Sequence, residues 1–173
     1  MTKLNKLLVI ILALILIFIL WQLLNNKSQI KQTVKNWLAE QGLQFTDLGA
    51  IDYNMQDDYP QYAFAVASQV GANTQDNIPW KDANKGILFC RTATGMVIVA
   101  NKVKGIKAAA LYNTEQAKKA RLTNNCNIGV IAGDWTSEPQ AREIIGIFLN
   151  TEFSREERHI RRVEQIKNFE DGV

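Results

Sequence analysis

Short apolar runs alternate with helix-like segments through the second half of the chain. The runs are KGILFC, GIKAAALY and IGVIAG, and the helix-like segments that follow the last two of them are NTEQAKKARLTNN and SEPQAREIIGIFLNTEF. This alternation predicts a parallel sheet whose strands are connected by crossover helices. Because the carboxyl ends of parallel strands meet at one edge of the sheet, we expect Cys90, Asn113 and the turn at 132–134 to cluster there.

The remaining segments add further elements to this pattern. QIKQTVKNWLAEQ has apolar residues at helical spacing, and Gly42 directly after it favours a helix end. LQFTDL, Leu43–Leu48, is predicted to be a strand, and QYAFAVASQVGA is predicted to be a helix. MVIVANKV, after the Thr92–Gly95 bend, fits either a strand or a buried helix. RHIRRVEQIKNFE is predicted to be a terminal amphipathic helix.

Leu7 to Leu24 form an apolar run in which Gln22 is the only polar side chain. A helix of this length can cross the hydrocarbon core of a bilayer, and no small-residue cleavage site of a signal peptide follows it. We therefore expect a single-pass transmembrane helix, with residues 1–28 as a membrane anchor and residues 29–173 as one α/β domain. The flanking lysines slightly favour a cytoplasmic domain, whereas a signal-anchor arrangement favours the opposite orientation.

The composition narrows the functional classes. The 173 residues carry a formal charge of +3, and the lysines and arginines are scattered along the chain. Nucleic acid is therefore not an expected partner. The two cysteines, Cys90 and Cys126, form no CxxC pair, and His159 is the single histidine, so we expect neither a metal site nor a cofactor. The sequence leaves open whether the cysteines are two reduced thiols or one disulfide.

Several separated motifs follow one another along the chain. They are DYPQYA, Asp58–Ala63; GILFCRTATGMVIVANKVKGIKAA, Gly86–Ala109; NNCN, Asn124–Asn127; and FLNTEF followed by RHIRRV. Over residues 29–167 this pattern resembles the ribose-5-phosphate isomerase B and galactose-6-phosphate isomerase family. The resemblance implies a doubly wound, Rossmann-like α/β fold and a homodimer whose sites are shared across its interface. It also implies that a sugar phosphate is isomerised between aldose and ketose through an enediolate, an intramolecular oxidoreduction.

The resemblance assigns three candidate site residues to the bend after the first apolar run. Cys90 matches the proton-abstracting cysteine of the family, Thr92 matches a threonine of its motif, and Gly95 matches the last glycine of that motif. A role for Cys90 as a small buried hydrophobic residue is the alternative. The family pattern is Cys-Gly-Thr-Gly-x-Gly, and this chain has Arg91 and Ala93 in place of two glycines. Side chains at these positions should narrow the backbone cradle for an oxyanion and disfavour a positive φ.

Three further residues are predicted to bind the substrate. Asn124 matches a family asparagine, and Arg158 and Arg162, four residues apart on a helix, share a face that suits a phosphate. The alternative is a solvated helix face on which the arginines pair with neighbouring glutamates. The family histidine that precedes the asparagine is Thr123 here, and a threonine cannot shuttle protons near neutral pH. An arginine expected after the next strand aligns with Asp134.

The first strand of the family falls on the apolar N-terminal run. Its Asp-His pair, which enters the family site, aligns with Leu24 and Asn25. Two functional hypotheses remain. The chain is either a membrane-anchored sugar-phosphate isomerase with residual or altered activity, or an inactive relative that binds sugar phosphate or serves assembly at the membrane. The missing family residues favour the second hypothesis, and a purely structural membrane protein is supported only by the anchor.

Overall fold

A parallel sheet of three strands forms the centre of the molecule, a computed structural model that describes residues 14–16, 30–51, 54, 56–72 and 78–173. The strands are β1 (Gly86–Cys90), β2 (Ala108–Leu111) and β3 (Ile128–Ala132), and their order in the sheet is β1-β3-β2. Both pairings are parallel, and all five residues of the central strand β3 are buried. The predicted parallel sheet is therefore confirmed.

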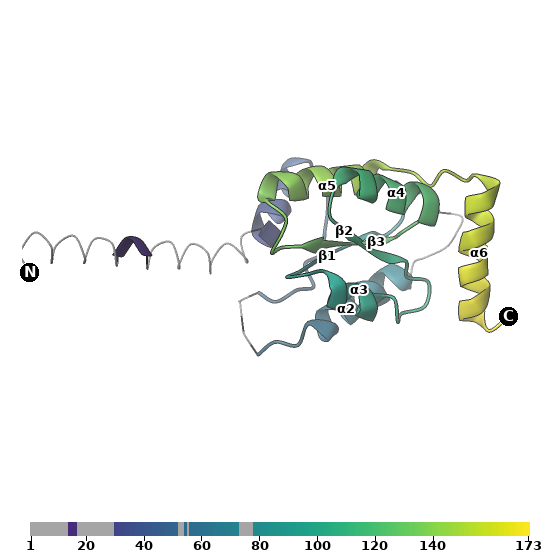
Figure 1. Cartoon of the computed structure of the whole chain (residues 1–173), viewed down its shortest axis with the longest axis horizontal. Helices are drawn as coiled ribbons and strands as arrows, with labels where there is room; N and C mark the ends of the chain where they lie inside the picture. Colours follow the sequence, from purple (N-terminus) through teal and green to yellow (C-terminus); the bar gives the residue numbers. More distant parts are fainter. Residues whose placement is uncertain (1–13, 17–29, 52–53, 55, 73–77) are drawn as a thin grey trace, which may run out of the picture.

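Helices cover both faces of the sheet (Figure 1). They are α2 (Tyr59–Gly71), α3 (Thr94–Ala100), α4 (Thr114–Asn124), α5 (Glu138–Asn150) and α6 (Glu157–Asp171), and residues 30–40 are also helical. Helices α4 and α5 lie on one face and α2 and α3 on the other, which is the doubly wound arrangement expected. The segment that fitted either a strand or a helix is α3.

Each face of the sheet has its own hydrophobic core. On one face, Val34 from the helical residues 30–40 packs with Leu111 and with Phe148 of α5. On the other face, Leu88 and Val130 pack against α2 and α3. Neighbouring residues of a strand point to opposite faces, so the continuous apolar strands of the sequence fill both layers.

Polar side chains fix the starts of two crossover helices. Asn113 Oδ1 accepts a hydrogen bond from the Gln116 backbone N–H at 2.8 Å, which caps α4. A capping box between Ser137 and Gln140 begins α5. These caps fix where the chain leaves β2 and β3 and therefore shape the edge of the sheet at which the strands end.

The outer edge of β1 has no neighbouring strand among the described residues. The Gly86 N–H donates to Asn127 O at 2.9 Å, and Cys90 O accepts from the Gly133 N–H at 2.8 Å. Alternate residues of β1 therefore bond to β3, and the backbone groups of Ile87 and Phe89 face the outer edge.

The predicted strand Leu43–Leu48 is wrong, because these residues form neither a helix nor a strand. They are held beside the helical residues 30–40, where Asp47 forms ion pairs of 2.8 Å with both Lys31 and Lys35. A strand needs a partner along its length, and no described strand lies beside this segment.

None of the helices in the described ranges is long and apolar enough to span a bilayer. The predicted transmembrane run lies outside those ranges except for Leu14–Leu16. The membrane helix and the boundary between residues 28 and 29 therefore stay predictions.

Helix α6 lies at the edge of the sheet where the strands begin, which we call the amino edge. The Gly105 N–H, which precedes β2, donates to Glu170 of α6 at 3.1 Å, and Lys104 pairs with Asp171. Figure 1 shows α6 at one end of the molecule, standing apart from the two helix layers. The opposite edge, where β1 and β3 end at Cys90 and Ala132, we call the carboxyl edge.

Candidate active site

Cys90 lies at the carboxyl edge, as the last residue of β1. It is half-buried, and its carbonyl oxygen accepts the Gly133 N–H at 2.8 Å, so the turn after β3 is held directly beside it. At the end of β2, the ring of Tyr112 lies 6.0 Å from that of Trp135. The expected clustering of the three strand ends at one edge is thus confirmed.

The bend after Cys90 contains a residue with a positive φ, although a side chain at that position disfavours such a conformation. Ala93 is fully buried and adopts φ 65°, in the left-handed region, immediately before α3. A non-glycine residue there is strained by about 1–2 kcal/mol, so the loop keeps a glycine-like conformation without a glycine. Thr92 is exposed in this bend, and its carbonyl oxygen accepts a long hydrogen bond of 3.4 Å from Thr94 Oγ1.

Tyr59 covers Gly95, a contact that the sequence analysis missed. A Cβ atom added to Gly95 would lie 2.7–2.9 Å from three atoms of the Tyr59 ring, including its hydroxyl. Pro60 follows in the first turn of α2 and fixes the helix start there, which is the local signal for the position of Tyr59. The ring is half-exposed, so a phenol group stands at the rim of the bend.

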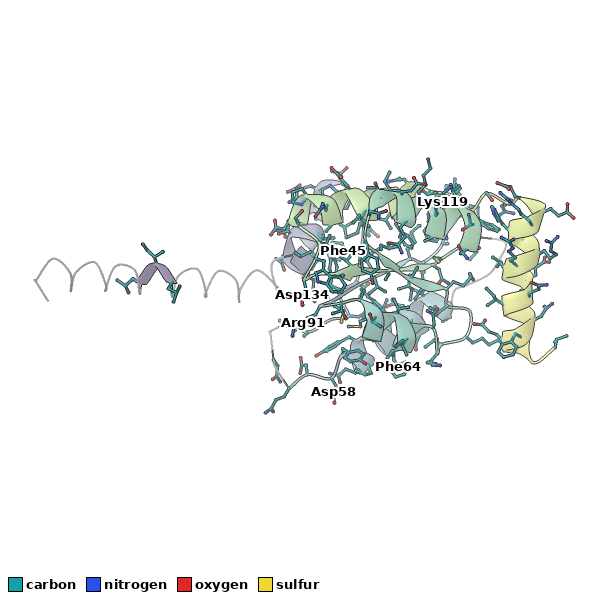
Figure 2. All side chains as sticks on the ribbon, viewed as in Figure 1. Phe45, Asp58, Phe64, Arg91, Lys119 and Asp134 are labelled. Carbon is teal, nitrogen blue, oxygen red and sulfur yellow. The ribbon has the colours of Figure 1, made fainter. Side chains whose placement is uncertain are left out.

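Arg91 and Asp134 form an ion pair at the carboxyl edge, and this pair was also missed. Arg91 Nε donates to Asp134 Oδ2 at 3.0 Å, and the Asp134 N–H donates to Arg91 O at the same distance. Figure 2 shows both side chains at the end of the molecule opposite α6. The pair joins the residue after β1 to the turn after β3, two segments far apart in the sequence.

The two cysteines are free thiols with different surroundings. Cys126 is buried, and burial raises the pKa of its thiol to about 11 although Arg121 lies nearby. That thiol stays protonated at neutral pH and is poorly suited to act as a base. Cys90, at the rim of the sheet, is the more accessible of the two.

Arg121 has a structural role. It is almost fully buried, its Nε donates to Thr151 O at 3.0 Å, and its guanidinium carbon lies 3.3 Å from the centre of the Trp80 ring. Burial lowers the pKa of Arg121 to about 10, so the group is still a cation at neutral pH. Its donors are used to join α4 to the end of α5, which leaves it no place in the candidate site.

The other predicted site residues lie at the amino edge, away from Cys90. Asn124 is the last residue of α4 and lines a hollow of about 520 Å³ that Glu170 of α6 also lines. Arg158 and Arg162 belong to α6. Within one chain, therefore, the structure groups Cys90 with the bend at one edge and the asparagine and arginines at the other.

The two arginines of α6 agree in part with the phosphate-binding hypothesis and in part with the alternative of a solvated helix face. Arg158 bonds to Glu156 through Nε and Nη2, both at 2.9 Å, as the solvated-face alternative predicts. Arg162 is exposed and has no ion pair among the described residues. His159 between them is buried, with Nδ1 2.7 Å from Ser154 Oγ. This histidine is therefore held inside the α6 junction and does not face Cys90.

No group of three or more His, Cys, Asp or Glu side chains in the described part of the chain is arranged to hold a metal ion. The carboxyl edge carries a thiol, a threonine hydroxyl, a phenol and one ion pair.

Comparison with known proteins identifies relatives. A family described as ribose/galactose isomerase matches residues 25–166. The D-erythrulose-4-phosphate isomerase of Pectobacterium atrosepticum is 35% identical over 126 residues, which are 72% of this chain and 76% of that protein. Ribose-5-phosphate isomerase B of Mycolicibacterium paratuberculosis is 31% identical over 142 residues, 82% of this chain and 84% of that protein.

The fold is similar to a solved structure as well. This is the crystal structure of ribose-5-phosphate isomerase B from Mycoplasma genitalium with bound ribulose-5-phosphate. The TM-score is 0.77 at 30% sequence identity, and the match covers 86% of this chain and 92% of the other.

Proposed function

The chain belongs to the ribose/galactose isomerase family, and we propose that it interconverts an aldose phosphate and a ketose phosphate. The observation that carries the proposal is the position of Cys90. It ends β1, beside the turn after β3, at the edge of a doubly wound sheet where ligands bind. The substrate class follows from the relatives, whose names state isomerisation of ribose 5-phosphate and of D-erythrulose 4-phosphate.

In this proposal Cys90 is the base. Its thiolate takes a proton from the carbon beside the substrate carbonyl and returns it to the neighbouring carbon, so that an enediolate forms and collapses. A second proton has to pass between the two substrate oxygens. The Thr92 hydroxyl, exposed in the bend, is our candidate for holding that proton, and the backbone at Gly95 lies within the same bend.

We further propose that a second copy of the chain completes the site. Asn124, Arg158 and Arg162 lie at the amino edge, so a homodimer that sets the amino edge of one copy against the carboxyl edge of the other would unite them with Cys90. Helix α6 also exposes an apolar stripe for such a contact. Phe169 is 85% exposed, and Ile166 is 46% exposed.

One observation favours a second function. In this alternative the chain is a module that binds sugar phosphate without turning it over. Ring opening of a cyclic sugar needs a group that exchanges protons near neutral pH. Thr123 stands where the family has a histidine, and its hydroxyl donates to Lys119 O at 2.8 Å. The single histidine, His159, is buried at the α6 junction.

A coupled isomerase assay separates the two functions. We expect Cys90→Ala to lower turnover of ribose 5-phosphate by about a hundredfold or more, because it removes the proposed base. The matched control is Cys126→Ala, which removes the other thiol and leaves the carboxyl edge intact, so its turnover should stay within a few-fold of wild type.

Turnover that persists in Cys90→Ala would refute the assigned base. A wild-type protein that is stabilised by several aldose phosphates and turns over none of them would be a binding module.

We also propose that residues 1–28 tether the domain to a membrane, with the domain on the cytoplasmic side. The proposal is supported by the apolar run Leu7–Leu24. The full chain should remain with the membrane fraction after alkaline extraction, and a chain lacking residues 1–28 should be released. Recovery of the full chain in the supernatant would contradict the tether.

A further inference from the structure

We propose that Arg91 binds the phosphate of the substrate at the carboxyl edge and that Asp134 holds it in position for this contact. This inference rests on the proposed function for the identity of the ligand. The site itself, an anion-binding guanidinium beside Cys90, depends only on the arrangement of the described residues.

The two residues are joined by reciprocal contacts. The Asp134 backbone N–H donates to Arg91 O at 3.0 Å, and Arg91 Nε donates to Asp134 Oδ2 at 3.0 Å. A guanidinium has five N–H donors, and this contact uses one of them. The four N–H groups of the two Nη atoms have no acceptor among the described residues, and they form the planar fork that binds phosphate oxygens in pairs.

The exposure of the two side chains differs sharply. The Asp134 side chain is 19% exposed and the Arg91 side chain is 74% exposed. The carboxylate is thus the fixed partner, and the guanidinium lies between it and the solvent. A ligand that approaches the edge meets the cation before it meets the carboxylate.

A solvent-exposed ion pair adds little to the stability of a folded protein, so stability gives little reason for this pair. Its position gives a better one. Arg91 directly follows Cys90, and Asp134 directly follows Gly133, whose N–H binds Cys90 O. A cation at this position attracts an anionic substrate towards Cys90.

The cation beside Cys90 therefore comes from the same chain as the thiol. The α6 arginines lie at the amino edge of their own chain, so they could reach this place only from a second copy. The inferred ligand chemistry is a phosphate monoester, with the sugar carbons reaching from Arg91 towards Cys90.

The test measures the affinity of the full chain, purified in detergent, for inorganic phosphate and for ribose 5-phosphate by titration calorimetry. Arg91→Ala should weaken both affinities by about tenfold or more, because it removes the planar fork of N–H donors. Arg91→Lys should restore only part of the affinity, since an ammonium group cannot bind two oxygens in a planar pair. Asp134→Ala removes the acceptor that positions Arg91 and should weaken both affinities, whereas Asp134→Asn keeps an acceptor for Arg91 Nε and should restore them.

The matched control is Lys35→Ala. It removes the cation of another ion pair, 2.8 Å from Asp47, and should leave both affinities unchanged. A wild-type chain that binds no phosphate, or an Arg91→Ala chain that binds it normally, would overturn the inference while leaving the proposed isomerase to be judged by turnover. Phosphate binding that depends on Arg91 in a chain without turnover would support the inference and count against the proposed isomerase.

Discussion

Gly95 shows how a single hydrogen atom in place of a side chain can shape the candidate site. The Tyr59 ring lies where a Cβ atom at residue 95 would be, at 2.7 Å. Gly146 of α5 is different, since a Cβ there would meet the Trp37 ring at an ordinary 3.7 Å. One glycine therefore makes room for a ring at the carboxyl edge, whereas the other lies inside the continuous helix α5.

Alanine at these two positions should have opposite effects. Gly95→Ala should displace the half-exposed Tyr59 ring and lower turnover by about tenfold or more, with a loss of stability near 1 kcal/mol. Gly146→Ala should raise the free energy of unfolding by about 0.5–1 kcal/mol and leave turnover unchanged, because alanine favours a helix interior. Denaturant unfolding and the coupled assay measure both quantities, and equal turnover in the two variants would refute a role for the Tyr59–Gly95 contact.

Part of the site could be predicted from the sequence because it is local. Cys90 ends one strand, and Thr92 and Gly95 follow it closely, whereas the left-handed backbone at Ala93 is one that the alanine side chain disfavours. The Arg91–Asp134 pair could not be predicted in this way. It requires that β1 lie beside β3, although β2 comes between them in the chain.

At the scale of elements, the least predictable segment is the one at residues 43–48. Its composition favours a strand, yet it is fixed by charge, through Asp47 and two lysines of the helical residues 30–40. Residues with a high strand propensity fit a pleated, half-buried surface, and a neighbouring strand has to provide that surface. The helices around the sheet other than α3 were predictable because their apolar periodicity and caps lie within each segment.

The ion pairs of Asp47 with Lys31 and Lys35 should make the free energy of unfolding depend on pH in the acid range. Burial raises the pKa of Asp47, but the hydrogen bonds from Lys31 and Lys35 outweigh it and lower the pKa from 3.8 to about 2. The folded state therefore binds this proton more weakly than the unfolded state. The stabilisation is complete above about pH 4 and is lost as the pH falls towards 2.

Asp47→Asn should remove this part of the pH dependence. At neutral pH it should lower the free energy of unfolding by less than about 1 kcal/mol, because the ion pairs are partly exposed to water. Unfolding midpoints between pH 2 and 7 give the comparison. A variant with the same acid transition as wild type would show that other carboxylates cause it.

At the scale of the whole molecule, the candidate residues occupy two opposite edges of one sheet. Helix α6 is connected to the amino edge through Gly105 and Lys104, and the Cys90 thiol lies where β1 ends. The family resemblance in the sequence predicts which residues take part. It cannot give the distance between them within one chain, because that distance follows from where α6 packs.

The most direct test of a site shared between two copies is complementation in a mixed dimer. Two variant chains are co-expressed with different tags. One carries Cys90→Ala, and the other carries both Arg158→Ala and Arg162→Ala. Dimers that carry both tags are isolated. If Cys90 of one copy works with the arginines of the other, one of the two sites in the mixed dimer is intact, so we predict about half of the wild-type turnover. Each variant alone should be nearly inactive. Mixed dimers as inactive as the separate variants would contradict the shared site.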